Sequence, residues 1–477
     1  MIKTFRLHNF KAFRDTGEIP LKPITVIAGP NSAGKSSILQ SLLLLKQTLE
    51  ATMDLPLNLD GRFIQASALS DLTFNQPALD DSEIGYDFTL EHQLPSTAVS
   101  SYFPHVQSLR KPAFLPVESE ISFVFRHGTF NGMRNKVGVH RLRLAIQLQG
   151  AAGPEIIFEH TGKAYSCSVK GAGIKSPTSD EIGRIVDALF FDFIPFGFVV
   201  ASDETPKRHD IVRLEPLLQR PLYDLGEELQ AHLKYLGPLR DEPRRAYLHS
   251  GSPSPEIGQR GQYAAQLLWL ERNNRVDYTQ SLDEQPTRTR LMQAVSHAFQ
   301  SLGITQPIDV RTTKNIVYQI LFGISRDDAT KHVTIADVGF GISQLLPIVV
   351  MGLRSPPSSI LLYEQPEIHL HPNLQANLAD FLLRLALQGK RIIVETHSDH
   401  FINRLRRRIA EDPTDQLNDK VSILFVHAPS WRQPARIETL RVDPYGIIEN
   451  WPPDFLPESA DEAAAILQAS LQKRRVH

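Results

Sequence analysis

The segment Ile24–Ser37 constrains the fold more than any other part of this sequence. It begins with four β-branched residues, ITVI, which are typical of a buried strand. The motif G-x-x-x-x-G-K-[ST] follows directly, and an apolar helical stretch begins where the motif ends. Glycine-rich loops of this kind let backbone N–H groups surround phosphate oxygens, and the helix N-terminus adds a favourable dipole. This order of strand, motif and helix predicts a binding site for a nucleoside triphosphate.

Each residue type in this phosphate-binding loop has a chemical role. Lys35 is expected to reach the β- and γ-phosphates, and the Ser36 hydroxyl is expected to coordinate Mg²⁺. The predicted nucleotide-binding residues of this segment are Gly29, Asn31, Ser32, Ala33, Gly34, Lys35, Ser36 and Ser37.

The composition indicates a long chain with balanced charge. Because 477 residues exceed one ordinary core, two or three domains are expected. Lys and Arg number 51 against 53 Asp and Glu, so any contact with nucleic acid must come from local patches. The one cysteine, Cys167, excludes an intramolecular disulfide, fits a reducing cytoplasm and is expected to be a small core thiol. The most apolar run, Leu189–Ala201, is too short to span a bilayer, which predicts a cytoplasmic protein without a membrane partner.

Hydrophobic periodicity divides the chain. Alternating strands follow the first 60 residues, and helical spacing appears from about residue 180, with one helix expected to end at Gly237-Pro238. Heptads do not persist, so no long coiled coil is expected. The predicted units are 1–60, with the phosphate-binding loop; 61–200, an antiparallel β-rich insertion; 201–330, a helical lobe with return strands; 331–412, the second half of the nucleotide site; and 413–477, a small C-terminal α+β extension with a helix at 460–472.

Two apolar strands in the unit 331–412 end in polar residues. Ile360–Glu364 delivers a carboxylate, and Glu364 is the predicted metal-side residue. Arg391–Glu395 is followed by Thr396-His397-Ser398. Because a crossover helix joins the two strands, both ends are expected at the same edge of a parallel sheet, where a nucleotide binds.

Together these motifs resemble the ABC-type ATPases and, within them, the RecF, SMC and OLD-like branch that is often described as AAA family ATPases. The resemblance is close over residues 1–60 and 331–410, and it implies an α/β ABC-type core that binds ATP and Mg²⁺. Tyr235–Arg240 and Gly446–Pro452 resemble a subgroup with a C-terminal segment of unknown function. The part after the helix that contains Arg408 lacks the acidic pattern of the nuclease that some OLD-like relatives carry, so no nuclease is expected in this chain.

The resemblance also assigns roles to two further residues. Val338–Gln344 matches the ABC signature, ahead of a helix predicted at Gln344–Leu353. In the family the serine of this motif, here Ser343, caps the γ-phosphate of a nucleotide held by a second subunit, which implies a homo-oligomer of at least two chains. His397 matches the switch histidine that senses the γ-phosphate.

One departure from the family pattern concerns hydrolysis. If Glu364 matches the metal-binding aspartate, Gln365 stands where these ATPases carry the catalytic glutamate. A glutamine orients water but cannot accept its proton, and loss of a general base typically costs about 10²–10⁴ in rate. Either Glu367 supplies the carboxylate, or hydrolysis is slow and the ATP-bound state is long-lived; we favour slow hydrolysis.

Several other polar groups permit more than one interpretation. His369 and His371 have no nearby third ligand, so a zinc site is disfavoured. The basic groups are either solvated faces or contacts for phosphate or nucleic acid. They comprise Arg240, Arg244 and Arg245; Arg404, Arg406, Arg407 and Arg408; and Arg126, Arg134, Lys136, His140, Arg141 and Arg143 in the insertion.

Two functions follow from these features. The first is a slowly hydrolysing ATPase that oligomerises around nucleotide and acts as a sensor or regulator for a separate effector protein, as in antiphage defence. The alternative is a DNA repair or recombination ATPase that clamps DNA directly. Gln365 favours the first function, and the arginine groups favour the second. A transporter ATPase is disfavoured by the large insertion and the C-terminal segment.

Overall fold

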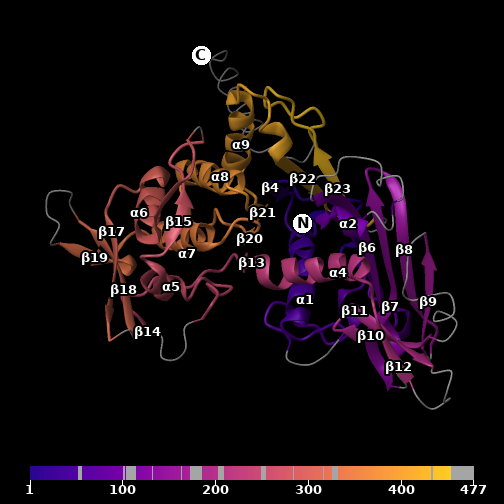
Figure 1. Cartoon of the computed structure of the whole chain (residues 1–477). Helices are drawn as coiled ribbons and strands as arrows, with labels where there is room; N and C mark the ends of the chain where they lie inside the picture. Colours follow the sequence, from indigo (N-terminus) through magenta and orange to yellow (C-terminus); the bar gives the residue numbers. More distant parts are fainter. Residues whose placement is uncertain are drawn as a thin grey trace, which may run out of the picture.

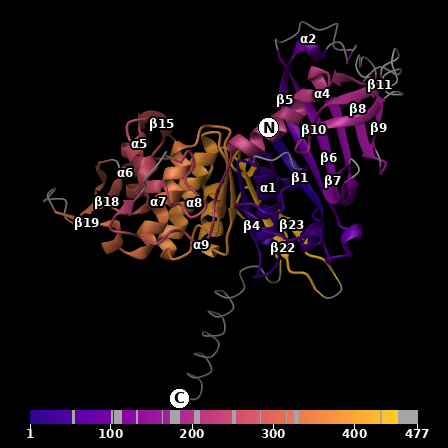
Figure 2. The same ribbon diagram turned by 90° about the horizontal axis from the view of Figure 1, so that it is seen from below.

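The computed structural model of the chain describes residues 1–51, 56–99, 103, 114–130, 133–162, 164–171, 185–201, 209–248, 254–282, 284–314, 316–324, 331–430 and 433–452. Figure 1 shows a central sheet with helices, a β-rich lobe on one side and a helical lobe on the other. Figure 2, seen from below, shows the two lobes again on opposite sides of this centre. The helix predicted at 460–472 lies outside the described residues.

The central sheet has six strands in the order β13-β20-β21-β4-β22-β23. The first five strands are parallel, and only β23 is antiparallel to its neighbour. Parallel neighbours require crossover connections, and these carry the helices that cover the sheet. The strands are β13 (Leu233–Leu236), β20 (Ile360–Glu364), β21 (Arg391–Glu395), β4 (Ile24–Ala28), β22 (Val421–His427) and β23 (Arg436–Leu440); the helices of this part are α1 (Lys35–Leu49), α7 (Phe340–Arg354), α8 (Pro372–Leu387) and α9 (Asp399–Glu411), with the short turns η5 (Ile335–Asp337) and η6 (Asn418–Lys420).

This sheet is buried on both faces, which explains why its strands are continuous apolar runs. Successive residues of β20 point to opposite faces, so Ile360 and Leu362 join one hydrophobic cluster while Leu361 and Tyr363 join the other. All four side chains are at most 1% exposed. The sheet therefore holds the two halves of the core together and fixes the positions of its strand ends.

The β-rich lobe is a second sheet, of antiparallel strands, in the order β2-β1-β5-β6-β7-β8-β9, with β3 beside β1. Alternate residues such as Tyr86, Phe88, Phe123 and Phe125 are buried on one face. The strands are β1 (Ile2–Phe10), β2 (Phe13–Asp15), β3 (Ile19–Pro20), β5 (Glu83–Pro95), β6 (Phe114–Phe130), β7 (Met133–Leu148), β8 (Ala151–His160) and β9 (Tyr165–Lys170); a smaller sheet contains β10 (Ile185–Phe191), β11 (Ile194–Ala201) and β12 (His209–Arg213), and the short helices are η1 (Leu69–Leu72), η2 (Leu79–Asp81) and α2 (Ser96–Val99).

The helical lobe combines helices with two small sheets, β14-β18-β17 with β19 beside β18, and β15-β16. Helix α6 ends at a left-handed glycine, Gly303 with φ 97°, which suits a helix C-terminus. The elements of this lobe are β14 (Tyr247–Leu248), α5 (Ala264–Glu271), β15 (Arg275–Tyr278), β16 (Thr287–Arg290), α6 (Leu291–Leu302), β17 (Ile308–Thr313), β18 (Val317–Gly323) and β19 (His332–Thr334). Helix α4 (Pro216–Glu227) packs instead against the β-rich lobe, and the π-helix η4 (Glu228–His232) that follows it packs against α1.

The predicted α/β class, with a nucleotide-binding core, an antiparallel insertion and a helical lobe, is confirmed. The longest described helix, α8, has 16 residues, so the described part of the chain contains no long coiled-coil arm. None of the described helices is both long enough and apolar enough to cross a membrane.

Some expected boundaries differ from the structure. The helix expected to reach Gly237-Pro238 ends at His232, because Leu233–Leu236 forms strand β13 and pairs with β20 in the central sheet. Strand β1 pairs with β5 of the insertion rather than with the core. Strand β22 pairs with β4, so the core sheet continues beyond residue 412. Each difference arises from pairing between segments distant in sequence.

A buried lysine connects α1 to the helical lobe. Lys46 is 1% exposed, and its ammonium group lies 2.7 Å from Glu50 and 3.4 Å from Glu256. It also donates a hydrogen bond of 2.8 Å to the carbonyl of Gln230 in the π-helix. Arg62 contacts both carboxylates, at 2.8 and 2.7 Å. The end of the helix that follows the phosphate-binding loop is thereby tied to a segment about 200 residues away in sequence.

Candidate active site

The loop between β4 and α1 has the backbone that its glycines allow. Gly29 and Gly34 have φ values of 145° and 103°, where L side chains are strained. A Cβ atom at Gly29 would lie 2.4 Å from the carbonyl oxygen of Val426, and one at Gly34 would lie 2.9 Å from the Cβ of Ala12. These two positions therefore require glycine for both conformation and space. Helix α1 begins at Lys35, so its N-terminus faces the loop.

A cavity of about 370 Å³ lies beside this loop. It is bordered by the loop, by the turn between β1 and β2, and by the ends of β20 and β21. Its lining residues are Lys11, Ala12, Asn31, Ser32, Gly34, Lys35, Ser36, Ser37, Gln365, Glu395 and His397. Two of the predicted loop residues do not line it: Ala33 is fully buried, and Gly29 packs against Val426.

The Lys35 side chain is folded back onto its own loop. Its ammonium group donates a hydrogen bond of 2.7 Å to the carbonyl of Pro30, and the residue is 4% exposed. Burial lowers the pKa of Lys35 from its ordinary value. The cation is thus held at the edge of the cavity by a neutral acceptor, which it can exchange for phosphate oxygens.

Glu395, at the end of β21, is the carboxylate that contacts the loop directly. Its Oε1 accepts a hydrogen bond of 2.9 Å from the Ser36 hydroxyl, and its Oε2 has no hydrogen-bond partner among the described residues. Burial and the nearby charge of Glu364 raise the pKa of Glu395 to about 7. From the sequence, Glu395 is predicted only as the end of a strand. Its position opposite Glu364, at the ends of two predicted parallel strands, was the signal that could have identified it.

Glu364 is engaged elsewhere. Its Oε2 accepts a hydrogen bond of 2.6 Å from the Tyr235 hydroxyl of β13, and burial raises the pKa of that phenol. Glu364 is directly opposite Glu395 in the parallel register of β20 and β21, but it does not line the cavity. The structure therefore brings Ser36 into contact with Glu395 and leaves the predicted metal-side residue on the neighbouring strand.

Gln365 and Glu367, the two alternatives for the water-activating position, point to different places. Gln365 has a φ of 43°, donates its backbone N–H to the carbonyl of Glu395 at 2.8 Å, and lines the cavity. Glu367 does not line the cavity and is 7% exposed, and its Oε1 accepts the backbone N–H of His397 at 2.8 Å. Burial raises the pKa of Glu367. Of these two residues, the cavity contains the glutamine.

Arg240 is a buried side chain that holds the backbone of Gln365 in place. It is 4% exposed, and one of its Nη atoms donates to the carbonyl of Gln365 at 3.1 Å. Burial lowers its pKa to about 10, an effect that the nearby Glu367 opposes. Arg240, unlike a solvated arginine, is therefore a buried structural residue and not a surface contact for nucleic acid.

His397 lines the cavity, and burial, followed by the charge of Lys35, lowers its pKa. The next residue, Ser398, caps helix α9 by accepting the backbone N–H of Phe401 at 3.0 Å. Because the chain turns into a helix here, the position of the imidazole is defined by both β21 and α9.

The signature segment lies apart from this cavity. Helix α7 begins at Phe340, four residues before its predicted start, because Gly339 serves as the N-cap. Ser343 is therefore inside the helix, is 7% exposed, and donates its hydroxyl to the carbonyl of Phe340 at 2.6 Å. Ser343 does not line the cavity beside Lys35.

The two histidines of the 369–371 segment have local roles. His369 has a φ of 64°, and its ring meets that of Phe340 edge to face at 4.9 Å. His371 is the N-cap of α8, where its ring accepts the backbone N–H of Asn373 at 3.4 Å.

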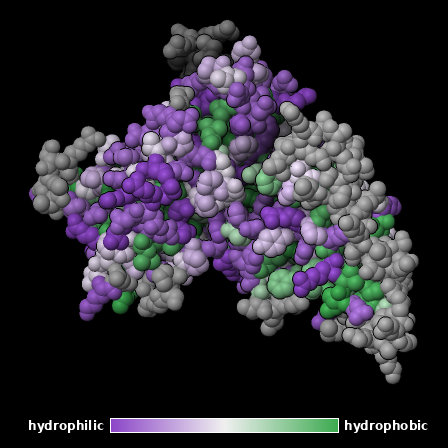
Figure 3. Space-filling view, viewed as in Figure 1, coloured by the Kyte–Doolittle hydropathy of each residue, from purple (hydrophilic) through white to green (hydrophobic). Residues whose placement is uncertain are grey.

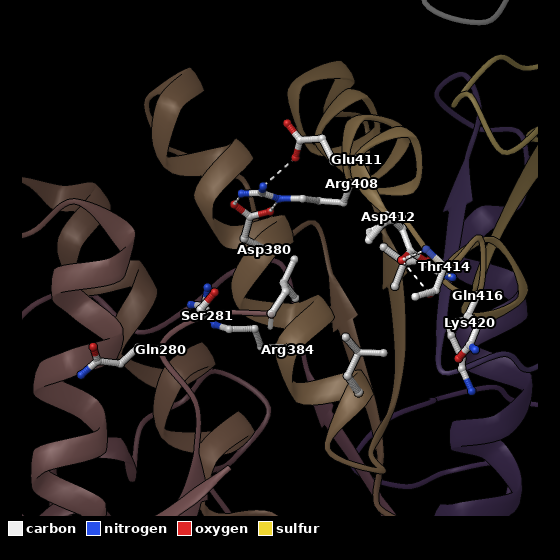
Figure 4. Close-up of a pocket in the computed structure, with 14 residues that line it drawn as sticks. Gln280, Ser281, Asp380, Arg384, Arg408, Glu411, Asp412, Thr414, Gln416 and Lys420 are labelled. Atoms are coloured by element: carbon white, nitrogen blue, oxygen red, sulfur yellow. Dashed lines mark hydrogen bonds and ion pairs between the residues drawn. The ribbon is translucent and has the colours of Figure 1, made fainter. Parts of the chain in front are cut away.

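The arginines of α9 are paired within the chain. Figure 4 shows one of them, Arg408, at a cavity of about 410 Å³ between α8, α9 and the loop at residues 280–282, where Asp380 lies against it. The acceptors are Asp380 for Arg404 and Arg408, Glu411 for Arg407 and Arg408, and the carbonyl of Gly446 for Arg406. In the insertion, Arg143 contacts Glu120 and Glu155 at 2.9 and 2.6 Å. Each of these guanidinium groups therefore has at least one acceptor within the chain.

One family of known proteins matches more than half of this chain. Residues 1–132 and 272–402 match the AAA ATPase domain family. No curated protein matches the sequence significantly. The chain is similar to a solved SMC head bound to the C-winged helix domain of ScpA, with 13% identity, a TM-score of 0.42, and coverage of 93% of this chain and 98% of that one. It is also similar to the SMC head domain from Thermotoga maritima, with 11% identity, a TM-score of 0.38, and coverage of 92% and 99%.

Proposed function

Because the chain belongs to the AAA ATPase domain family, we propose that it is a slowly hydrolysing ATPase whose ATP-bound state, more than its turnover, is the functional signal. In this proposal the phosphate-binding loop holds ATP in the cavity of about 370 Å³. Lys35 leaves the carbonyl of Pro30 and contacts the β- and γ-phosphates. His397, which also lines the cavity, contacts the γ-phosphate.

The observation that carries the proposal is the placement of Gln365. A general base must lie within hydrogen-bond reach of the water whose proton it accepts. Gln365 borders the cavity, whereas Glu367 is buried outside it and already accepts the backbone N–H of His397. The amide of Gln365 orients the attacking water, but it does not accept a proton, so hydrolysis is expected to be slow.

The residues beside the loop suit Mg²⁺. The Ser36 hydroxyl and the carboxylate of Glu395 offer hard oxygen donors, and one oxygen of Glu395 has no hydrogen-bond partner among the described residues. A bound Mg²⁺ would neutralise phosphate charge during transfer of the γ-phosphoryl group. The protein groups then have separate tasks: Lys35 and His397 orient the γ-phosphate, and Gln365 orients water.

Assembly is proposed to bring Ser343 to a second nucleotide site. The N-terminus of α7 is a favourable position for an anion, and a Cβ atom built at its N-cap, Gly339, would meet no atom within 4 Å. Phe340 beside it is 43% exposed. Since Ser343 does not border its own cavity, the γ-phosphate it would contact belongs to ATP on a partner chain, in a dimer or larger oligomer.

The biological role that we propose is regulation of a separate effector protein in antiphage defence, in the cytoplasm. A protein partner is supported by apolar surface on the β-rich lobe (Figure 3), where Phe191 and Ile211 are 63% and 66% exposed. The alternative, a DNA repair or recombination ATPase that clamps DNA directly, has less support, because the α9 arginines have partners within the chain.

Two variants test slow turnover. In single-turnover assays with Mg²⁺ and ATP, Gln365→Glu should accelerate hydrolysis by about 10²-fold or more, because it restores a proton acceptor at the water. Glu367→Gln should change the rate little, and ATP alone should hold the assembled state. A collapse of the rate in Glu367→Gln, with little change in Gln365→Glu, would show instead that Glu367 is the base and that the protein is a cycling ATPase. Lys35→Ala, which removes the cation that binds the phosphates, is the control without ATP binding.

A further inference from the structure

The position of Glu395 in the central sheet distinguishes it from the other carboxylates. Strand β21 lies between β4, which leads into the phosphate-binding loop, and β20, which carries Glu364. The register places Glu395 opposite Ile27 on one side and Glu364 on the other. Because neighbouring strands are about 4.8 Å apart, Glu395 starts one strand nearer to the loop than Glu364 does.

The contacts of Glu395 and Glu364 also show that Glu395 is the carboxylate nearer to the loop. Glu395 borders the cavity and accepts the Ser36 hydroxyl at 2.9 Å, yet it is 1% exposed and its Oε2 has no hydrogen-bond partner among the described residues. Glu364 accepts the Tyr235 hydroxyl at 2.6 Å and does not border the cavity. A buried carboxylate oxygen without a partner costs free energy in the folded state. We therefore expect the Oε2 atom of Glu395 to bind a group that the protein alone does not supply.

A cation is the partner that suits this position when a triphosphate is bound. Lys35, the ammonium group that also lines the cavity, donates to the carbonyl of Pro30 and is needed by the phosphates. A triphosphate without a metal would bring negative charge toward the Glu395 carboxylate, and the two would repel each other. A divalent cation between them removes the repulsion, and hydroxyl and carboxylate oxygens are ligands that Mg²⁺ and Mn²⁺ accept.

We propose that Glu395, rather than Glu364, is the carboxylate that holds the divalent cation of the bound nucleotide beside Ser36, and that nucleotide binding therefore depends on that cation. This assignment rests on the proposed ATPase function. Glu364 is a positioning residue on the adjacent strand, held away from the cavity by Tyr235.

The experiment compares two matched variants, Glu395→Gln and Glu364→Gln. Each removes one negative charge at nearly constant volume, from positions that are directly opposite each other in the sheet. Binding of ATPγS is measured by calorimetry in EDTA and across a Mg²⁺ titration. Wild type should bind ATPγS tightly only with Mg²⁺. Glu395→Gln should raise the half-saturating Mg²⁺ concentration about 10–100-fold and strengthen binding in EDTA. Glu364→Gln should follow the wild type in both measurements.

A second readout follows the cation directly. Mn²⁺ replaces Mg²⁺, and the electron paramagnetic resonance signal of free Mn²⁺ reports its retention with ATPγS. Retention should fall in Glu395→Gln and persist in Glu395→Asp, which keeps a carboxylate. Circular dichroism checks that each variant is folded, and Glu395→Asp answers the same question if the glutamine variant does not fold.

The outcomes separate this assignment from its alternatives. If Glu395 only holds the Ser36 hydroxyl by a hydrogen bond, the glutamine of Glu395→Gln can still accept that hydroxyl. Binding of ATPγS with and without Mg²⁺ would then be the same as in the wild type, and that result overturns the proposal. It is equally overturned if Glu364→Gln, and not Glu395→Gln, loses the dependence on Mg²⁺. If the wild type binds no ATPγS at any Mg²⁺ concentration, the proposed ATPase function fails, and the assignment fails with it.

Discussion

The raised pKa of Glu395 predicts that this residue destabilises the protein when no metal is bound. Burial and the charge of Glu364 raise its pKa from the ordinary 4.5 to about 7. Well below pH 4.5 the carboxyl is protonated in both the folded and the unfolded chain and contributes nothing. Between these two values the unfolded chain ionises while the folded chain keeps its proton, so the free energy of unfolding falls as the pH rises. Above about pH 7 the full penalty is present.

The size of this penalty follows from the two pKa values. Because each pKa unit corresponds to about 1.4 kcal/mol, the change from 4.5 to about 7 amounts to on the order of 3 kcal/mol. Replacing Glu395 by glutamine removes the ionisable group and keeps an acceptor for the Ser36 hydroxyl. The variant should therefore be more stable than the wild type at pH 8. For a cooperative unit of roughly 150–250 residues, the gain corresponds to about 6–12 °C in Tm.

The assay is thermal unfolding of both proteins in EDTA at pH 5 and pH 8, with the difference taken at each pH. Other groups that titrate in this range are common to both proteins and cancel. At pH 5 the two Tm values should nearly coincide. Glu364→Gln is the matched control: its amide still accepts the Tyr235 hydroxyl, and it removes only the neighbouring charge while Glu395 stays buried, so its gain at pH 8 should be smaller than that of Glu395→Gln. The reasoning is refuted if Glu395→Gln gains nothing at pH 8, or gains equally at pH 5.

Three further outcomes are expected. Lys46→Met should lower the free energy of unfolding by about 2–4 kcal/mol, because the carboxylates of Glu50 and Glu256 lose their buried cationic partner. Lys3→Met, which removes a surface pair with Glu91, should cause a much smaller loss in thermal unfolding, and similar losses in the two variants would contradict this prediction. Burial raises the pKa of Cys167 to about 12, so iodoacetamide at pH 8 should label it slowly in the folded protein and rapidly in urea, and fast labelling of the folded protein would disagree. Ser343→Arg should abolish ATP-dependent association in sedimentation while leaving binding of ATP to the single chain intact, and a wild type that stays monomeric with ATP would reject the proposed assembly.

Local patterns were sufficient to predict the parts of the site that lie within one segment. Residues 24–37 form a strand, loop and helix as expected, because the glycines permit a backbone that other residues strain to adopt, and because β-branched and helix-forming residues flank them. The alternation of β5 and β6 likewise specified an antiparallel insertion with one buried face.

The strand ends show what local patterns could not predict. Sequence reasoning placed Glu364 and His397 at one sheet edge, and they do end neighbouring segments there. It did not identify Glu395 as the partner of Ser36, because the order of strands decides which carboxylate lies beside the loop. Nor did it anticipate Tyr235, which reaches Glu364 only because Leu233–Leu236 pairs with β20.

The sequence by itself therefore determined which residue types are present for nucleotide chemistry, including the absence of a carboxylate at Gln365. Such features depend on bonded neighbours and on side-chain chemistry, which a linear sequence contains in full. Only the tertiary structure decided that Gln365 borders the cavity while Glu367 is buried against His397, and that the α9 arginines pair with Asp380 and Glu411. Those outcomes depend on strand order and helix packing between segments that are tens to hundreds of residues apart. Small differences in the free energy of burial and pairing determine which side chains become partners, and the sequence alone does not distinguish among them.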